Sequence, residues 1–337
     1  MIKISYVMND NDENVKRILE RIGVSEGHIS KIDTYANTLL KVETEEKTLF
    51  LKIYDDDKKA KVGYKLAHLY PLLSSKGIAV PEVLRYDDSK ELIQRPYLIM
   101  TAVQGRMLSD AIADMGPAEE ISFFGKLGNM TARLHSITYD RFGETIDGNE
   151  VGGYIEANDK GPFTTWKDMH KEIINYRLNI FKDSPFGDLI NPISSWFEEN
   201  SGLIDYGIVP RLLHIDLNQK NIFVKDNEVS GIIDLDGAFI GHNEEELMRI
   251  EGANFSSDEE LRQSFLKGYE QIIRLDDGYE KRRRYYYLSR LLVHIGCMIR
   301  FGDEYTNISK EEKVLRKEIN SILSNGEVDF DKNKKNA

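Results

Sequence analysis

Hydrophobic and polar residues alternate differently in the two halves of the chain. Near the start, apolar residues recur every three or four positions over residues 10–22, which predicts an amphipathic helix. Two runs rich in β-branched and aromatic residues follow at 29–42 and 47–54, on either side of a polar turn at 43–46. Such runs around a turn predict a β-hairpin.

In the second half of the chain, apolar residues recur with the period of helices. A helix at 59–75 and a strand at 97–105 come before this change. The glycine-rich segment 142–163 predicts a loop. The helices expected after residue 105 are 121–137, 166–181, 192–199, 259–273, 278–301 and 309–323. Strands first and helices later predict an α+β protein.

A second hairpin is predicted within the helical half. Residues 222–224 and 229–235 are short apolar runs that flank a turn of polar residues. Folding the chain about this turn is expected to pair Val224 with Ser230.

Three oxygen-bearing side chains are expected at the open end of this hairpin. The same pairing brings Asn221 near Asp234, with side-chain roots about 5 Å apart, and Asp216 comes one short loop earlier. Carboxylate and amide oxygens suit Mg²⁺, which often shares them with substrate phosphates. Asp216 is then left to orient or deprotonate a substrate hydroxyl, as in phosphoryl transfer. The alternative is that these residues cap turns or end a strand in solvent.

These residues form a recognisable motif. His-x-Asp-x-x-x-x-Asn at 214–221, followed by two apolar residues and Asp at 232–234, resembles the catalytic core of the aminoglycoside phosphotransferase and choline kinase families, relatives of protein kinases. Ile215 stands where those families usually show glycine. Residues 241–247 are similar to their Gly-Asp-Pro-x-x-Asp-Leu, with Glu246 in place of the second Asp.

The resemblance implies a bilobal, protein-kinase-like fold with a small β-rich N-terminal lobe and a larger, mostly helical C-terminal lobe. The expected boundaries are 1–105 for the nucleotide-binding lobe with its hinge and 106–330 for the catalytic and substrate lobe, followed by a disordered tail at 331–337. It also implies an ATP- or GTP-dependent and Mg²⁺-dependent phosphotransferase, which moves a γ-phosphoryl group to a hydroxyl of a small molecule.

The resemblance further assigns roles to the motif residues. Asp216 is expected to orient the hydroxyl, and Asn221 and Asp234 to hold the metal. His214 is expected to fix the loop by hydrogen bonding rather than to move protons. Asp236 is a candidate for supporting the metal site or for holding a second ion.

The nucleotide contacts are expected in the first lobe. Lys52 lies in a predicted strand and is expected to grip the phosphates. The resemblance places backbone groups of Thr101 and Val103 at the purine edge and Met100 at the back of the same pocket.

Two features depart from the families. The loop at 33–38, where a glycine-rich phosphate cover is expected, has no glycine. No glutamate lies between Glu46 and Glu82, so the helix after Lys52 cannot supply that lysine with its usual partner. These departures favour the alternative of a non-catalytic binding protein with a kinase fold. A metal-dependent hydrolase and a kinase of choline, ethanolamine, homoserine or sugars are further alternatives.

Composition narrows the choice of partners. The net charge of −12 argues against nucleic acid, which binds clustered Lys and Arg. An acidic protein can attract a cationic acceptor such as an aminoglycoside. Seven acidic residues of the helical half are candidates for such a pocket: Glu244, Glu245, Asp258, Glu259, Glu260, Asp303 and Glu304.

The expected location is cytoplasmic. No apolar run approaches the roughly 20 residues needed to cross a bilayer, and the N-terminus lacks the apolar core of a signal peptide. The single cysteine, Cys297, is expected to be a buried small hydrophobe. The sequence leaves the oligomeric state open.

Overall fold

A computed structural model describes residues 2–4, 12–32, 37–255, 258–302 and 308–324. The tail expected at 331–337 and most of the loop at 33–38 lie outside the described residues. The fold is α+β, with an antiparallel sheet first and a largely helical part afterwards, as the sequence predicts.

Two compact units make up the chain. Unit 1 comprises 1–110, 146–150 and 222–236, and unit 2 comprises 111–145, 151–221 and 237–337.

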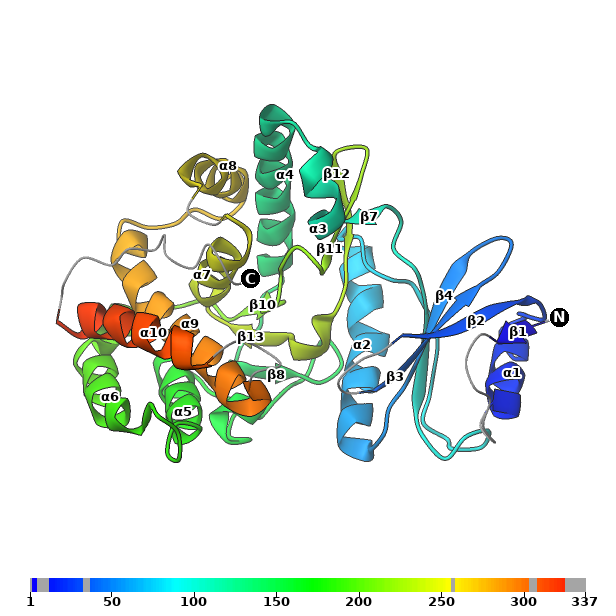
Figure 1. Ribbon diagram of the computed structural model, residues 1–337, viewed down its shortest axis with the longest axis horizontal. Helices are drawn as coiled ribbons and strands as arrows, with labels where there is room; N and C mark the ends of the chain where they lie inside the picture. The colour runs from blue at the N-terminus through cyan, green and yellow to red at the C-terminus, as the bar shows by residue number, and fades with distance from the viewer. Residues whose placement is uncertain (1, 5–11, 33–36, 256–257, 303–307, 325–337) are drawn as a thin grey trace. The chain divides into compact units, whose positions relative to one another are not determined.

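Unit 1 is built on a six-stranded sheet. Its strands, in spatial order, are β1 (Ile2–Ile4), β2 (Gly27–Ile32), β3 (Thr38–Glu43), β4 (Thr48–Ile53), β6 (Tyr97–Thr101) and β5 (Val83–Asp87). All neighbours are antiparallel except β1 and β2. Alternate residues of β4, Leu49, Leu51 and Ile53, are buried, because side chains of a strand point to opposite faces. Helices α1 (Asp12–Glu20) and α2 (Asp57–Ser75) belong to the same unit (Figure 1).

The predicted second hairpin also belongs to unit 1. Strands β11 (Ile222–Lys225) and β12 (Glu228–Ile232) pair with each other, and β11 also pairs with the short strand β7 (Arg106–Met107). The expected pairing of Val224 with Ser230 is wrong. Val224 pairs with Val229, because a bulge leaves Ser230 as an extra residue on β12.

The bulge connects the hairpin to the segment that follows β6. The Ser230 hydroxyl donates to the carbonyl of Gln104 at 2.6 Å. Gly105 next to it has a φ of +101°, and a Cβ there would lie 2.3 Å from the carbonyl oxygen of Val224. The backbones approach so closely that only glycine fits at this position.

Unit 2 contains the long helices and a four-stranded sheet in the order β10-β13-β8-β9. The strands are β10 (Arg211–Leu213), β13 (Phe239–Gly241), β8 (Gly143–Thr145) and β9 (Val151–Gly152). The helices are α4 (Pro117–His135), α5 (Trp166–Asn179), α6 (Ile190–Glu199), α7 (Asn243–Asn254), α8 (Glu259–Tyr269), α9 (Tyr279–Phe301) and α10 (Ile308–Leu323). The short helix α3 (Leu108–Ala111) lies where the chain passes from unit 1 to unit 2.

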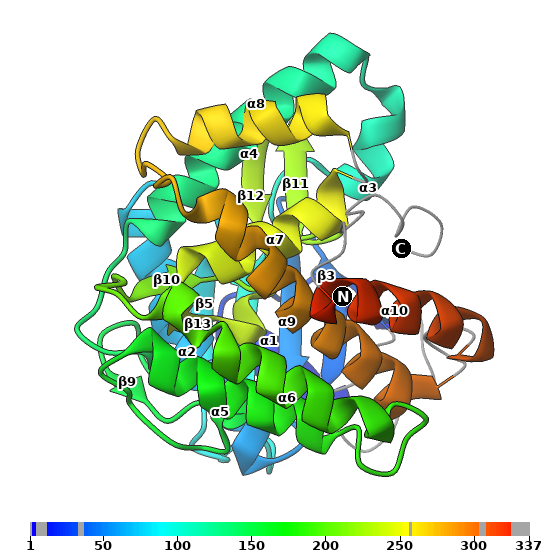
Figure 2. The same cartoon turned by 90° about the vertical axis from the view of Figure 1, so that its left-hand side faces the viewer.

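The helices of unit 2 pack around a core rich in aromatic residues. Helices α5 and α6 run side by side, and α4 and α8 cross closely (Figure 2). The indole of Trp166 donates to the hydroxyl of Tyr286 at 2.9 Å in the interior. No helix in the described parts of the chain is both long and apolar enough to span a bilayer.

Two local features differ from the sequence-based expectation. The segment 142–163 contains the paired strands β8 and β9 instead of being only a loop. Helix α7 was not predicted, because its first turn begins with three consecutive glutamates that give no amphipathic pattern.

The close approach at Gly105 gives a testable prediction. Gly105→Ala should lower the free energy of unfolding by about 2 kcal/mol, since it adds backbone strain and a clash with the Val224 carbonyl. Gly207→Ala is the control, because a Cβ at Gly207 meets nothing within 4 Å. Equal denaturant midpoints for the two variants would contradict this reading.

Candidate active site

Lys52 is held by a carboxylate of its own unit. It lies on β4 opposite the buried residues of that strand, and its side chain is only 13% exposed. Its Nζ lies 2.5 Å from Oδ2 of Asp236, which is 184 residues later in the sequence. The Nζ also lies 5.7 Å from the centre of the Tyr54 ring. The partner of Lys52 that the sequence could not identify is therefore Asp236.

A second lysine reaches the same residue. Lys65 lies in α2 and is only 2% exposed, and its Nζ donates to the backbone carbonyl of Asp236 at 2.7 Å. The helix that lacks a glutamate thus contributes a buried cation instead. Sequence reasoning missed Lys65, although its position one turn before the buried Leu69 was a signal that it lies on the apolar face of the helix.

The segment around Asp236 can accept a cation. Oδ1 of Asp236 is buried and has no hydrogen-bond partner among the described residues. Asp234 is exposed, with a left-handed backbone at φ +66°, which aspartate tolerates better than most residues. Burial first and the charge of Asp236 second raise the pKa of the nearby Tyr54 and Tyr70, so both phenols stay neutral. Carboxylate oxygens of this kind fit Mg²⁺.

The residues expected to meet a purine lie at the end of β6. The N–H of Thr101 donates to the carbonyl of Glu82, and that of Ala102 to the carbonyl of Thr48, both at 2.9 Å. The N–H of Thr101 is therefore already used within unit 1. Met100 is half-buried in β6, and its pairing with Phe50 of β4 fixes its position in the sheet.

In unit 2, a buried glutamate shapes the loop that contains Asp216. The carboxylate of Glu246 accepts the N–H of His214 at 2.9 Å and that of Ile215 at 2.7 Å. Nε2 of His135 lies 2.8 Å from the same carboxylate. Burial raises the pKa of Glu246, but the hydrogen bond and charge of His135 and the amides lower it more, so its pKa lies below the ordinary value.

This network explains the unusual backbone at Ile215. Its φ is +69°, a conformation that a β-branched residue rarely adopts. Such a residue costs about 1–3 kcal/mol and persists only where the surroundings enforce it. The N–H groups of His214 and Ile215 belong to successive peptide units, and their hydrogen bonds to Glu246 supply that constraint.

The loop presents Asp216 to solvent and ties it to Asn221. The amide nitrogen of Asn221 donates to the backbone carbonyl of Asp216 at 2.8 Å and to its Oδ2 at 3.1 Å. Asn218 donates to Oδ1 of Asp216 at 2.9 Å. Asn221 thus uses its nitrogen within the loop, which makes its carbonyl oxygen the atom suited to bind a cation.

The predicted site residues therefore fall into two groups. Unit 1 contains Lys52, Asp234, Asp236 and the three residues that were predicted to meet a purine, and unit 2 contains His214, Asp216 and Asn221. His214 is fully buried, and its Nδ1 accepts the N–H of Asp216 at 3.4 Å.

Glu246 and His135 were not identified as site residues from the sequence. The position of Glu246 in the motif at 241–247 was the available signal. His135 gives no local signal, because it meets Glu246 from 111 residues away.

The acidic residues that could form a pocket for a cation have other contacts. Glu244 and Glu245 are buried and paired with arginines. Asp258 caps α8, and Glu259 pairs with Arg262 of its own helix at 2.8 Å. Glu260 is exposed, and the other two candidates, at positions 303 and 304, lie outside the described residues.

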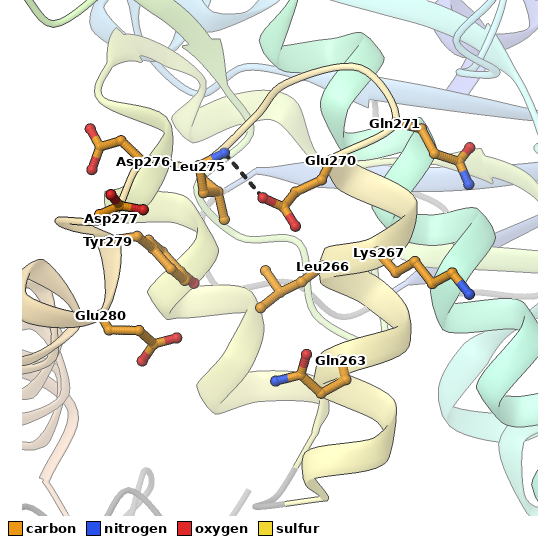
Figure 3. Close-up of a pocket in the computed structure, with 10 residues that line it drawn as sticks. All are labelled: Gln263, Leu266, Lys267, Glu270, Gln271, Leu275, Asp276, Asp277, Tyr279 and Glu280. Atoms are coloured by element: carbon orange, nitrogen blue, oxygen red, sulfur yellow. Dashed lines mark hydrogen bonds between the residues drawn. The ribbon is translucent and has the colours of Figure 1, made fainter.

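One open pocket of about 470 Å³ lies between α8 and the start of α9. Figure 3 shows carboxylates at its rim and Leu266 at its wall, with Glu270 accepting the N–H of Leu275 at 3.3 Å. It contains none of the predicted site residues: its lining is Gln263, Leu266, Lys267, Glu270, Gln271, Leu275, Asp276, Asp277, Tyr279 and Glu280.

Comparison with known proteins identifies relatives of this chain. The model of the phosphotransferase enzyme family matches residues 29–285. A chloroplastic protein-ribulosamine 3-kinase of Arabidopsis thaliana is 29% identical over 192 residues, 53% of each chain. Acyl-CoA dehydrogenase family member 11 of Homo sapiens is 27% identical over 174 residues, which are 50% of this chain and 20% of that protein. The match thus spans a fifth to about half of these relatives.

Solved structures share the fold over nearly the whole chain. A thermostable mutant of aminoglycoside phosphotransferase APH(4)-Ia, in complex with ADP and hygromycin B, has a TM-score of 0.64 and 18% identity, covering 92% of this chain and 98% of its own. A protein described as a fructosamine-3-kinase from Haemophilus somnus has a TM-score of 0.61 and 21% identity, covering 92% and 97%. At these identities the likeness establishes the fold.

The Glu246 network gives a prediction with a defined pH dependence. Glu246→Gln should lower the free energy of unfolding by about 3 kcal/mol at pH 7, because it removes a buried charge from its donors. The pKa of Glu246 is lowered on folding, so the carboxylate stabilises the protein above its unfolded pKa of about 4.3, and this stabilisation is lost as the pH falls through the lower folded pKa.

The measurement is denaturant unfolding of the wild type and of Glu246→Gln between pH 7 and pH 3. The difference in free energy of unfolding between the wild type and Glu246→Gln should become smaller toward pH 3. Glu260→Gln serves as the control, since Glu260 is exposed. A gap that stays constant with pH would mean that the charge of Glu246 does not stabilise the fold.

Proposed function

The chain belongs to the phosphotransferase enzyme family, and we propose that it transfers the γ-phosphoryl group of ATP or GTP to a hydroxyl of a small molecule, with Mg²⁺. The observation that carries this proposal is the loop around Asp216. An exposed carboxylate is held there in a strained, fully hydrogen-bonded backbone that a solvent-exposed turn would not need.

Asp216 acts on the acceptor in this proposal. Its carboxylate accepts the hydroxyl proton or orients the hydroxyl toward phosphorus. The hydrogen bonds from Asn218 and Asn221 fix the rotation of the carboxylate. Most of the rate enhancement then comes from positioning and from neutralising charge.

The phosphates and the metal are assigned to different residues in this proposal. Lys52 binds α- and β-phosphate oxygens, while Asp234 and the carbonyl oxygen of Asn221 hold Mg²⁺. The ion, when bound, neutralises charge that develops on the phosphoryl oxygens. Asp236 keeps Lys52 extended from β4, and its buried Oδ1 is an additional candidate ligand.

Lys65 is part of this site. Beside the pair of Lys52 with the Asp236 carboxylate, Lys65 adds a second cation to the segment that contains Asp234 and Asp236. It also fixes the Asp234–Asp236 segment through the carbonyl of Asp236.

Transfer is tested with γ-labelled ATP and a set of hydroxyl compounds. Label on an acceptor supports the proposal, label found only as free phosphate indicates a hydrolase, and no ATP-dependent thermal stabilisation indicates that there is no nucleotide site.

Substitution of the two aspartates should separate their roles. Asp216→Asn should reduce turnover at least about 100-fold while the Kd for Mg-ATP stays within about twofold of the wild type. Asp234→Asn should weaken Mg²⁺-dependent binding of ATP about tenfold. Both are measured by calorimetry and label transfer, with Asp226→Asn in the hairpin turn as the control. Equal losses of binding in both variants would contradict the assignment.

Replacement of the buried lysine tests its role. Lys65→Met should raise the Kd for Mg-ATP about tenfold, because it removes a cation and releases the Asp236 carbonyl. Lys61→Met, in the exposed preceding turn of α2, is the matched control. Lys65→Arg should restore part of the affinity. A loss of thermal stability with an unchanged Kd would show that Lys65 only supports the fold.

A further inference from the structure

A group of charged residues in unit 2 lies beside Asp216. Arg249, in α7, has its Nη1 at 3.5 Å from the carbonyl oxygen of Ile215, the residue before Asp216. Arg249 therefore lies against the backbone of the loop that presents Asp216.

The two glutamates in this neighbourhood are already paired. Arg177 donates through Nε and Nη2 to Glu156 at 3.1 and 3.0 Å, and through Nη1 to Glu245 at 3.2 Å. Burial raises the pKa of Glu245, but Arg177 and its other donors bring it well below the ordinary range, so Glu245 stays ionised. Neither carboxylate has excess charge to offer to a cationic acceptor.

Arg249 differs from Arg177, because not all of its N–H groups have hydrogen-bond partners. Its side chain is 18% exposed, and its Nη2 lies 3.4 Å from Glu245. Its Nε is buried and has no hydrogen-bond partner among the described residues. A guanidinium has five N–H groups, and the two contacts it makes here are at the long end of hydrogen-bond distances.

The guanidinium of Arg249 is partly exposed and lies beside the loop that presents Asp216, where it can meet a ligand of opposite charge. Arginine binds carboxylates and phosphates with paired N–H groups and charge-assisted hydrogen bonds.

We propose that the acceptor is an alcohol that also carries an anionic group, a carboxylate or a phosphate, and that Arg249 binds this group while Asp216 orients the hydroxyl. The inference rests on the proposed phosphotransferase function and adds the chemical class of the substrate to it. Arg249 is a specificity-determining residue in this view, and the polycationic aminoglycosides are poor acceptors.

Binding is tested separately from turnover, on the full chain with Mg-ADP. The probes are matched pairs that differ in charge: gluconate with gluconamide, and glycerol 3-phosphate with glycerol, with kanamycin as the polycation. The wild type should bind at least one anionic member about tenfold or more tightly than its neutral partner. The two pairs also distinguish a carboxylate from a phosphate.

Variants of Arg249 then connect the preference to this residue. Arg249→Met should abolish the preference for the anionic probe, and Arg249→Lys should keep part of it. Label transfer from ATP should show the same loss, as a rise in KM rather than a fall in kcat. Arg274→Met, which removes an exposed arginine between α8 and α9, is the matched control. Should the methionine variant fail to fold, the lysine variant carries the comparison.

The outcomes separate this inference from the proposed function. Equal binding of charged and neutral probes, tighter binding of kanamycin, or an anion preference that survives in Arg249→Met would each overturn the inference. Label transfer to a neutral or cationic alcohol would overturn it while leaving the phosphotransferase function intact. Anion binding that depends on Arg249, without any transfer of label, would support the site and contradict the function.

Discussion

The carboxylate of Glu246 is the constraint on which the candidate active site depends. It is buried, and it accepts two consecutive backbone N–H groups of the loop that precedes Asp216. Moving such a charge out of water is costly, and its donors offset that cost only in one geometry. The loop is therefore fixed by the same interaction that makes the burial of Glu246 tolerable, and Ile215 keeps a backbone conformation that it would otherwise leave.

The sequence predicted the parts of the fold that depend on local pattern. Strands β4 and β6, most long helices and the hairpin follow from hydrophobic periodicity and turn residues, whereas the run predicted at 29–42 forms two strands, β2 and β3, and β1 and β5 were not predicted. It did not predict α7, whose first turn has acidic residues that are buried because partners elsewhere in the chain neutralise them. Nor did it predict the bulge at Ser230, which depends on a contact with Gln104. Local pattern cannot reveal features that distant partners determine.

The pairing of Lys52 illustrates the same limit at the candidate site. The absence of a glutamate in α2 is visible in the sequence, but the partner of Lys52 is not, because Asp236 lies in the short turn at Leu235–Gly237 that follows the hairpin. Lys52 could be selected from its place in a strand, and Asp236 from its motif. Their contact does not follow from the sequence, because 184 residues separate them. Lys52 is thus paired with a carboxylate, but this carboxylate comes from the turn at Leu235–Gly237 and not from α2.

Net charge is a poor guide to the acceptor for a related reason. Interactions between exposed charges are screened beyond about 8 Å at physiological ionic strength, so a total of −12 says little about one loop. Glu244 pairs with Arg282, and Glu245 pairs with Arg177 and Arg249, so these two carboxylates of α7 are neutralised by arginines. The local field next to Asp216 is thus set by which charges are already paired.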